Sequence, residues 1–429
     1  MLSRQCNSKW AASSCLFFIV LFFAACAPAT QTPEVEAPPV VRLKTGADVL
    51  HQSGFALFEG KTIGLVVNHT ARVDSMHLGD LVEQAPNVKL GAFFSPEHGI
   101  RGDADAGEEI ADGVDQKTGL PVHSLHGKER KPAQEDLVGL DALVFDIQDI
   151  GARFYTYIST MGYAMQAAAE AGIPFYVLDR PNPLGGNYVA GFVLEEAFSS
   201  FVGLYPVPVA HGLTVGELAR MIKGEGYLDG LENLALHVVE MEGWDRTQKW
   251  PATGRTWRPT SPNIPDFTTA VAYIGTCFFE AVDASEGRGT RTPFTQVGAS
   301  WLDAQVLVDS LEAAQLPGVA FSRASFTPES IADMSRNPRF EGELQQGVHI
   351  EITDLETFDP LETGMHLLAG FYAQALENDF VNKSWMGRLA GTDQLAELLE
   401  MQVPPAQIVD AWEEDVHQFT QARQPYLLY

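Results

Sequence analysis

Two apolar segments of the chain end abruptly in polar side chains that could carry acid–base chemistry. Residues 91–94 (GAFF) run into Glu97 and His98, and residues 142–145 (ALVF) run into Asp146. In an open α/β sheet, ligands bind beyond the carboxyl ends of the strands. The sequence therefore predicts a polar active site on an apolar scaffold, with Glu97, Asp146 and His98 as catalytic candidates.

The two carboxyl groups suit the hydrolysis of a glycosidic bond. Glu97 lies between Pro96 and Gly99, which shape a tight turn where partial burial would raise the pKa towards that of a general acid. Glycosidases need such an acid and a second carboxylate, for which Asp146 is the candidate. The alternative is that Glu97 caps the next element. We expect Asp149 to cap the turn that follows Asp146.

Four arginines in loops marked by glycine or proline could bind an acidic ligand. The four arginines are Arg101, Arg153, Arg180 and Arg288. They stand out because the chain as a whole is acidic, with a formal net charge of −28. A guanidinium grips a carboxylate through two parallel hydrogen bonds. These arginines would suit an acidic substrate that the overall charge repels, or they form internal salt bridges with neighbouring aspartates.

The remaining candidates share these loops and could contact a sugar; they are Gln148, Tyr155, Asn182, Asn263, Glu280 and Glu286. Tyr155 and the neighbouring Tyr157 offer a stacking face and a hydroxyl, or they are aromatics that pack a helix. Glu280 and Glu286 are further binding carboxylates, or they orient Arg288.

The absence of three well-known motifs argues against several kinds of site. The sequence has no HExxH-type spacing, no GxSxG elbow and no GxGxxG after the first strand. We therefore expect no metal, no serine-hydrolase mechanism and no dinucleotide cofactor. The acidic balance also argues against nucleic acid as a partner.

Strand-like and helix-like segments alternate in the first half of the chain. Strands are expected at 62–67, 92–94, 143–145, 174–178 and 236–239, with helices near 78–82, 161–171 and 218–222, the last preceded by a capping box of Thr214 and Glu217. This alternation predicts an α/β fold with a Rossmann-like, mostly parallel sheet. Glycine and proline crowd residues 243–265, so we predict an N-terminal domain over 46–250 and a smaller α/β C-terminal domain over 251–429.

The N-terminus has the pattern of an export signal. Basic Arg4 and Lys9 precede an apolar stretch and two small residues, after which comes Cys26. We predict a lipoprotein signal peptide over 1–25 and lipidation of Cys26; the alternative is ordinary cleavage that releases a soluble protein. Residues 26–45, rich in proline and alanine, would form a disordered tether. The protein would then be exported, anchored to a membrane by its lipid alone and facing the periplasm. Cys277 would be left without a disulfide partner.

Six motifs together resemble one bacterial family; they are residues 94–102 (FSPEHGIRG), 146–157, 178–186 (LDRPNPLGG), 211–218 (HGLTVGEL), 261–265 and 285–294. The chain resembles the exo-β-N-acetylmuramidases (NamZ-like), formerly a domain of unknown function. It departs from similar proteins at residues 280–283 (EAVD), where those often have Glu-Gly-Thr-Asn.

The resemblance implies two α/β domains with the active site between them. It also implies release of N-acetylmuramic acid from the non-reducing end of peptidoglycan fragments, in cell-wall turnover or recycling. It places Glu97 on the family's candidate catalytic glutamate.

Two functional hypotheses follow. In the first, Glu97 protonates the glycosidic oxygen and Asp146 acts as nucleophile or electrostatic partner, or else orients an attacking 2-acetamido group of the substrate. Gln148 and Asn182 would hold the sugar, and Arg153 and Arg288 its lactyl carboxylate. In the second, the protein is a non-catalytic lipoprotein that binds muropeptides or sugars. The first requires positions 97 and 146 to face a common cavity.

Overall fold

The computed structural model describes residues 42–97, 99–102, 112–127, 129–375 and 380–429. These residues belong to one compact unit. The expected signal peptide, Cys26, most of the tether and His98 lie outside the described residues. The domain boundary near residue 250 stays a prediction. Among the described residues, no helix combines the length and the apolar character that crossing a membrane requires.

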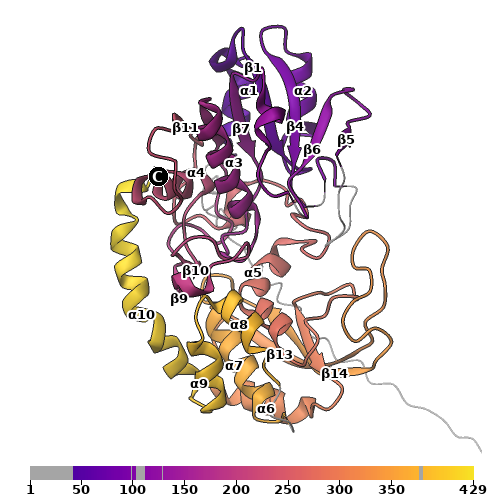
Figure 1. Ribbon diagram of the computed structural model, residues 1–429. Helices are drawn as coiled ribbons and strands as arrows, with labels where there is room; N and C mark the ends of the chain where they lie inside the picture. Colours follow the sequence, from indigo (N-terminus) through magenta and orange to yellow (C-terminus); the bar gives the residue numbers. More distant parts are fainter. Residues whose placement is uncertain (1–41, 98, 103–111, 128, 376–379) are drawn as a thin grey trace, which may run out of the picture. The chain divides into compact units, whose positions relative to one another are not determined.

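A seven-stranded sheet forms the scaffold of the first half of the chain (Figure 1). The order is β11 (Leu236–Val239), β8 (Phe175–Leu178), β7 (Ala142–Asp146), β1 (Thr62–Val67), β4 (Lys89–Ser95), β6 (Pro121–Ser124) and β5 (Gly113–Val114). All neighbours pair in parallel except β5, which is antiparallel to β6. The predicted α/β fold with a Rossmann-like, mostly parallel sheet is confirmed.

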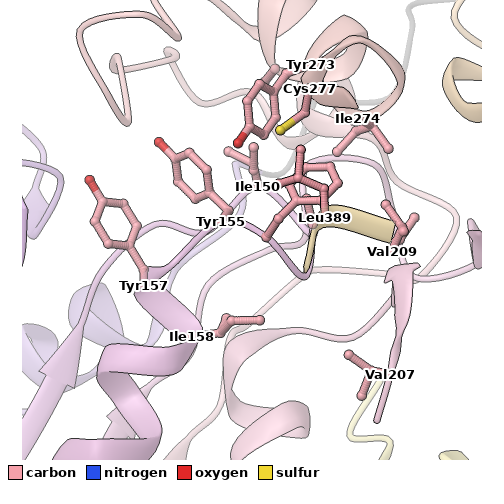
Figure 2. Close-up of a cluster of buried hydrophobic side chains, with 14 of the residues drawn as sticks. Ile150, Tyr155, Tyr157, Ile158, Val207, Val209, Tyr273, Ile274, Cys277 and Leu389 are labelled. Atoms are coloured by element: carbon pink, nitrogen blue, oxygen red, sulfur yellow. The ribbon is translucent and has the colours of Figure 1, made fainter. Parts of the chain in front are cut away.

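Helices cover both faces of this sheet because its central strands are apolar on both. Along β1, Leu65 belongs to the apolar cluster that includes residues of α1 (Gly46–Gln52) and α2 (Leu78–Gln84). Its neighbour Val66 belongs to the cluster that includes α3 (Tyr157–Ala171) and α4 (Val215–Glu225). Successive side chains of a strand point to opposite faces, so a continuous apolar run fits a parallel strand buried on both sides. Figure 2 shows a part of the buried core near the start of α3.

The predicted capping box is present at the start of α4. The Thr214 hydroxyl accepts a hydrogen bond from the Glu217 backbone N–H, and the Glu217 carboxylate accepts one from the Thr214 N–H. A second capping box, of Thr45 and Asp48, begins α1. Each box satisfies N–H groups that have no partner within the helix.

A three-stranded antiparallel sheet anchors the second half of the chain, in the order β12 (Gln296–Ala299), β14 (Gln345–Ile352) and β13 (Val319–Phe326). The helices of this half are α5 (Phe267–Thr276), α6 (Ala304–Ala314), α7 (Pro360–Tyr372), α8 (Lys383–Ala390), α9 (Gln394–Glu400) and α10 (Pro405–Ala422). Helix α5 packs so closely on α7 that a Cβ atom at position 275 would collide with the Pro360 carbonyl. Glycine at this position permits the contact.

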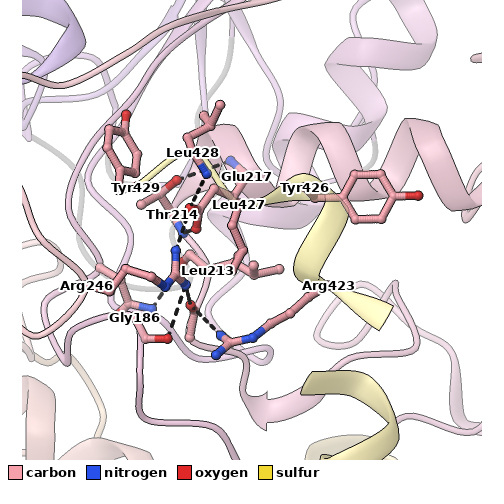
Figure 3. Close-up of polar contacts among 12 residues, drawn as sticks. Gly186, Leu213, Thr214, Glu217, Arg246, Arg423, Tyr426, Leu427, Leu428 and Tyr429 are labelled. Atoms are coloured by element: carbon pink, nitrogen blue, oxygen red, sulfur yellow. Dashed lines mark hydrogen bonds and ion pairs between the residues drawn. The ribbon is translucent and has the colours of Figure 1, made fainter. Parts of the chain in front are cut away.

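The C-terminal residues return to the first half of the chain (Figure 3). Helix α10 packs on β9 (Ala190–Val193), which pairs with β10 (Pro208–Ala210). Beyond it, the Leu428 N–H donates to the Glu217 carboxylate at 2.9 Å, and Arg246 donates to the same oxygen at 2.6 Å. The Tyr429 hydroxyl donates to Asp179 at 2.8 Å. Asp179 follows β8, so the end of the chain is fixed to the carboxyl edge of the large sheet.

Candidate active site

Glu97 lines a cavity of about 100 Å³ just beyond the end of β4. The other lining residues are Phe154, Tyr155, Thr156, Tyr157, Ser261, Asn263, Ile264, Tyr273, Arg288 and Phe294. Among the described residues that line it, Glu97 is the single carboxylate. The cavity thus joins the turn after β4, the segment before α3 and three segments of the second half of the chain.

Three tyrosines form an aromatic wall of this cavity (Figure 2). The ring centroid of Tyr155 lies 5.1 Å from that of Tyr157 and 6.0 Å from that of Tyr273. The hydroxyls of Tyr155 and Tyr157 donate to the Thr260 hydroxyl and carbonyl at 2.8 and 2.7 Å. Burial raises the pKa of Tyr157 well above its usual value. The hydroxyl therefore stays neutral.

Arg288 is the cation of the cavity, and two carboxylates position it. Its guanidinium lies 2.7 Å from Glu280 and 3.5 Å from Glu286, and it stacks on the Phe294 ring with its centre 4.8 Å from the centroid. Burial acts to lower the pKa of Arg288, but the two carboxylates outweigh it and raise that pKa. Of the two roles foreseen for Glu280 and Glu286, the contacts support the orientation of Arg288.

Asn263 brings a hydrogen-bond acceptor to the cavity wall. Its Nδ2 donates to the Met334 carbonyl at 2.9 Å, while its buried Oδ1 has no hydrogen-bond partner among the described residues. An orphaned buried acceptor is costly in a folded protein. A ligand hydroxyl or N–H would satisfy it.

The expected role of Asp146 requires correction. Asp146 is fully buried at the end of β7, where its two oxygens accept hydrogen bonds of 2.5 and 2.9 Å from Arg180. It does not line the Glu97 cavity, so the expectation that positions 97 and 146 face a common cavity is wrong. Since both oxygens are used, Asp146 serves as the counter-ion of Arg180 and not as a nucleophile beside Glu97.

Arg153 is also corrected, because its charge is used inside the fold. It is fully buried, and its two terminal nitrogens donate to four backbone carbonyls, those of Phe192, Val207, Leu389 and Ala390. Burial lowers its pKa to about 9. A side chain enclosed in this way has no access to a substrate carboxylate.

Two further candidates have structural contacts instead of the expected binding role. Arg101 makes ion pairs with Asp80 at 3.0 Å and Asp115 at 2.7 Å, which is the salt-bridge alternative. Asn182 is buried, and its side chain bonds to the backbone of Leu184 and Leu213. Neither residue lines the Glu97 cavity.

Gln148 and Arg180 line a different cavity, which is described below. The structure therefore brings together six of the sequence candidates, namely Glu97, Tyr155, Asn263 and Arg288 at the cavity and Glu280 and Glu286 behind Arg288. Tyr157, considered with Tyr155 from the sequence, also lines the cavity. Sequence reasoning left Tyr273 and Phe294 outside the candidate set. Tyr273 lies in an apolar helical stretch that carries no signal of a site.

Asp149 caps its turn, as expected, and is strongly buried. Its Oδ2 accepts a hydrogen bond from the Gly151 N–H at 2.7 Å and lies 3.9 Å from Nε2 of His211. Burial raises the pKa of Asp149 to about 7 and lowers that of His211 to about 3. Both side chains are therefore mostly neutral in weakly acidic solution.

The raised pKa of Asp149 predicts a pH-dependent contribution to stability. Between about pH 4 and pH 7 the unfolded chain loses this proton while the folded protein keeps it, so the contribution of Asp149 falls as pH rises, by about 1.4 kcal/mol per pH unit. Asp149→Asn removes the titration. The unfolding free energy of wild type minus that of the variant should therefore fall from pH 5 to pH 7 in urea titrations.

Asp410→Asn, at an exposed position of α10, is the control and should show a constant difference. A difference for Asp149→Asn that is equally constant would show that Asp149 is ionised in the fold across this range.

Comparison with known proteins identifies the family of the chain. Residues 63–268 match the family model "Exo-beta-N-acetylmuramidase NamZ, N-terminal", and residues 271–429 match its C-terminal counterpart. The chain belongs to the NamZ family. Its predicted resemblance to exo-β-N-acetylmuramidases is confirmed.

A curated NamZ relative and two solved structures support this membership. The peptidoglycan β-N-acetylmuramidase NamZ of Bacillus subtilis (strain 168) is 39% identical over 416 residues, which are 96% of this chain and 97% of the relative. A DUF1343 family protein of Bacteroides fragilis NCTC 9343 superposes with a TM-score of 0.82 at 38% identity, covering 91% of this chain and 99% of its own. A second one from that organism has a TM-score of 0.76 at 31% identity, covering 90% and 99%.

Proposed function

We propose that this NamZ family member is an exo-acting glycoside hydrolase that releases N-acetylmuramic acid from the non-reducing end of peptidoglycan fragments. The observation that carries this proposal is the cavity in which one carboxylate, Glu97, lies with neutral tyrosine hydroxyls, an open acceptor on Asn263 and the cation Arg288. The family membership and the name of the Bacillus subtilis relative support the substrate class.

In the proposed reaction, Glu97 donates a proton to the glycosidic oxygen as the bond to the anomeric carbon breaks. The described residues offer no second carboxylate at this cavity, so the oxygen of the sugar's own 2-acetamido group is the attacking group that we favour. This attack closes a ring between the acetamido oxygen and the anomeric carbon. Water then opens that ring at the anomeric carbon, and Glu97 takes back a proton from the water. Both displacements together retain the anomeric configuration.

The cavity offers partners for three features of such a sugar, namely a hydrogen-bond donor, a ring face and the lactyl carboxylate. Asn263 Oδ1 would accept a hydrogen bond from a hydroxyl or an amide N–H. The planar sugar face would lie against Tyr155 or Tyr157, and Arg288 would bind the lactyl carboxylate. Because Glu280 and Glu286 already hold Arg288 in place, little side-chain freedom is lost on binding.

Replacement of the proposed acid should abolish turnover. We expect Glu97→Gln to lower kcat by at least about 100-fold on a muramic-acid-terminated disaccharide, because a positioned general acid contributes roughly 10²–10⁴-fold. The loss should be smaller on an aryl β-N-acetylmuraminide, whose leaving group needs less protonation. Both rates are measured by release of N-acetylmuramic acid, and binding by calorimetry.

Glu83→Gln, at an exposed position of α2, is the matched control and should leave both rates unchanged. Full activity of Glu97→Gln would remove Glu97 from the chemistry. Tight saccharide binding by the wild type without any hydrolysis would favour the alternative, a non-catalytic muropeptide-binding protein.

We also propose that the protein is an exported lipoprotein facing the periplasm, attached to its membrane through lipid on Cys26. The support comes from the sequence alone, namely the basic start, the apolar stretch 10–23 and the small residues before Cys26. A lipid chain would add the hydrophobic attachment that the tether itself lacks.

Substitution of the lipidated position should release the protein from membranes. In cells that express the full chain, we expect wild type in the membrane fraction and Cys26→Ala in the soluble exported fraction, as measured by immunoblotting after fractionation. Cys277→Ala, at the buried cysteine, serves as the control for loss of a thiol. Membrane association of Cys26→Ala equal to wild type would contradict the anchor.

A further inference from the structure

A second cavity, of about 260 Å³, is lined by five arginines and is separate from the Glu97 cavity. The arginines are Arg42, Arg72, Arg180, Arg255 and Arg258, and the remaining lining residues are Thr70, Asp74, Ser75, Gln148, Trp250 and Thr256. Asp74 is the one carboxylate among the described lining residues. In a chain with a formal net charge of −28, this is an unusual concentration of positive charge.

The cavity lies where the fold is suited to bind a ligand. Thr70 follows β1, Gln148 follows β7 and Arg180 follows β8, and these three strands are neighbours in the parallel sheet. The carboxyl edge of such a sheet is the usual place for a ligand. The fourth wall comes from Arg255 to Arg258, which precede the residues that line the Glu97 cavity.

Three of the arginines have carboxylate partners. Arg42 pairs with Asp74 at 2.9 Å, Arg180 with Asp146, and Arg255 with Asp48 at 2.6 Å. These pairs leave each of the three arginines neutralised within the protein.

The other two arginines make hydrogen bonds to backbone carbonyls instead. Arg72 donates to the carbonyls of His69 and Ser75 at 3.0 and 2.7 Å, and Arg258 donates to that of Asp74 at 3.2 Å. Five guanidiniums therefore face three paired carboxylates, and two positive charges remain in excess at the cavity.

The neighbouring positive charges help to lower the pKa of two of these arginines. Burial lowers the pKa of Arg72, and the charge of Arg258 lowers it further. Burial likewise lowers the pKa of Arg255; Asp48 opposes this, and the charge of Arg180 adds to it. An anion among these groups would relieve the repulsion.

Gln148 adds a second, independent sign of a ligand. It lines the cavity and is only 4% exposed. Its Nε2 donates to the carbonyls of Asp149 and Pro181, both at 2.9 Å, whereas its buried Oε1 has no partner among the described residues. A buried acceptor of this kind requires a donor, such as a hydroxyl or an N–H.

We propose that this cavity binds an oxyanion, either a phosphate or a carboxylate group. The molecule that carries this group also has a hydroxyl or N–H close to the negative oxygens. Arg72 and Arg258 bind the anion, and Gln148 accepts the neighbouring donor. The site stands whether or not Glu97 is the catalytic acid. The anion belongs either to an acidic peptide attached to the saccharide substrate or to a free small molecule.

Titration with inorganic phosphate and with citrate tests the site directly. At low ionic strength, calorimetry on the wild type should show saturable binding of at least one of them, and Arg258→Gln and Arg72→Gln should each weaken it at least tenfold. Added sodium chloride should weaken it as well. Arg323→Gln, on an exposed position of β13, is the matched control and should bind as wild type does.

Arg258 is itself exposed, so its replacement should leave the melting temperature unchanged and keep the test valid if Arg72→Gln fails to fold. The absence of saturable binding of either anion by wild type would overturn the proposal. Equal affinities of wild type and Arg258→Gln would overturn it too.

Kinetics then distinguish the two sources of the anion. If the anion is part of the substrate, Arg258→Gln raises KM for a muropeptide with an acidic peptide and leaves KM for the peptide-free disaccharide unchanged. If it is a free molecule, anion binding is lost while both KM values stay the same. Should no saccharide be hydrolysed at all, the proposed function fails while the anion titration still decides this site.

Discussion

A guanidinium buried away from water must find partners inside the protein, and much of this structure is organised around one such group. Arg153 lies in the segment between β7 and α3, and its terminal nitrogens donate to carbonyls in β9, before β10 and at the end of α8. Leaving these donors without partners would cost several kcal/mol. The segments are therefore fixed together, and Tyr155 and Tyr157, which follow directly, are fixed with them.

The same constraint divides the polar residues at the sheet edge into two groups. Asp146 is buried and pairs with Arg180, which lines the second cavity, and Asp149 accepts a hydrogen bond from the backbone of its own turn. Other polar side chains at this edge line two cavities, one around Glu97 and one around the five arginines. Residues 255–264 contribute to both, so the two cavities share one segment of the chain.

The sequence predicts the scaffold well because its signals are local. The apolar runs within β1 and β7 and the capping box at Thr214 each lie within a few residues, and the structure has them where they are expected. The arginines are different. Whether Arg153 faces a substrate or a backbone carbonyl depends on Leu389, which is more than 200 residues away. Likewise, Arg72 and Arg258 form one site only after the chain has folded, although the paired arginines of residues 255–258 (RTWR) in so acidic a chain were a usable signal.

The central claim is that Glu97 reaches the scissile bond in the cavity lined by Tyr157 and Asn263. The most direct measurement is a crystal structure of the Glu97→Gln variant with a muramic-acid-terminated disaccharide. The account predicts the glycosidic oxygen within about 3.2 Å of the substituted side chain and the sugar against the tyrosines. A disaccharide whose glycosidic oxygen lies far from position 97, with the sugar outside this cavity, would contradict it.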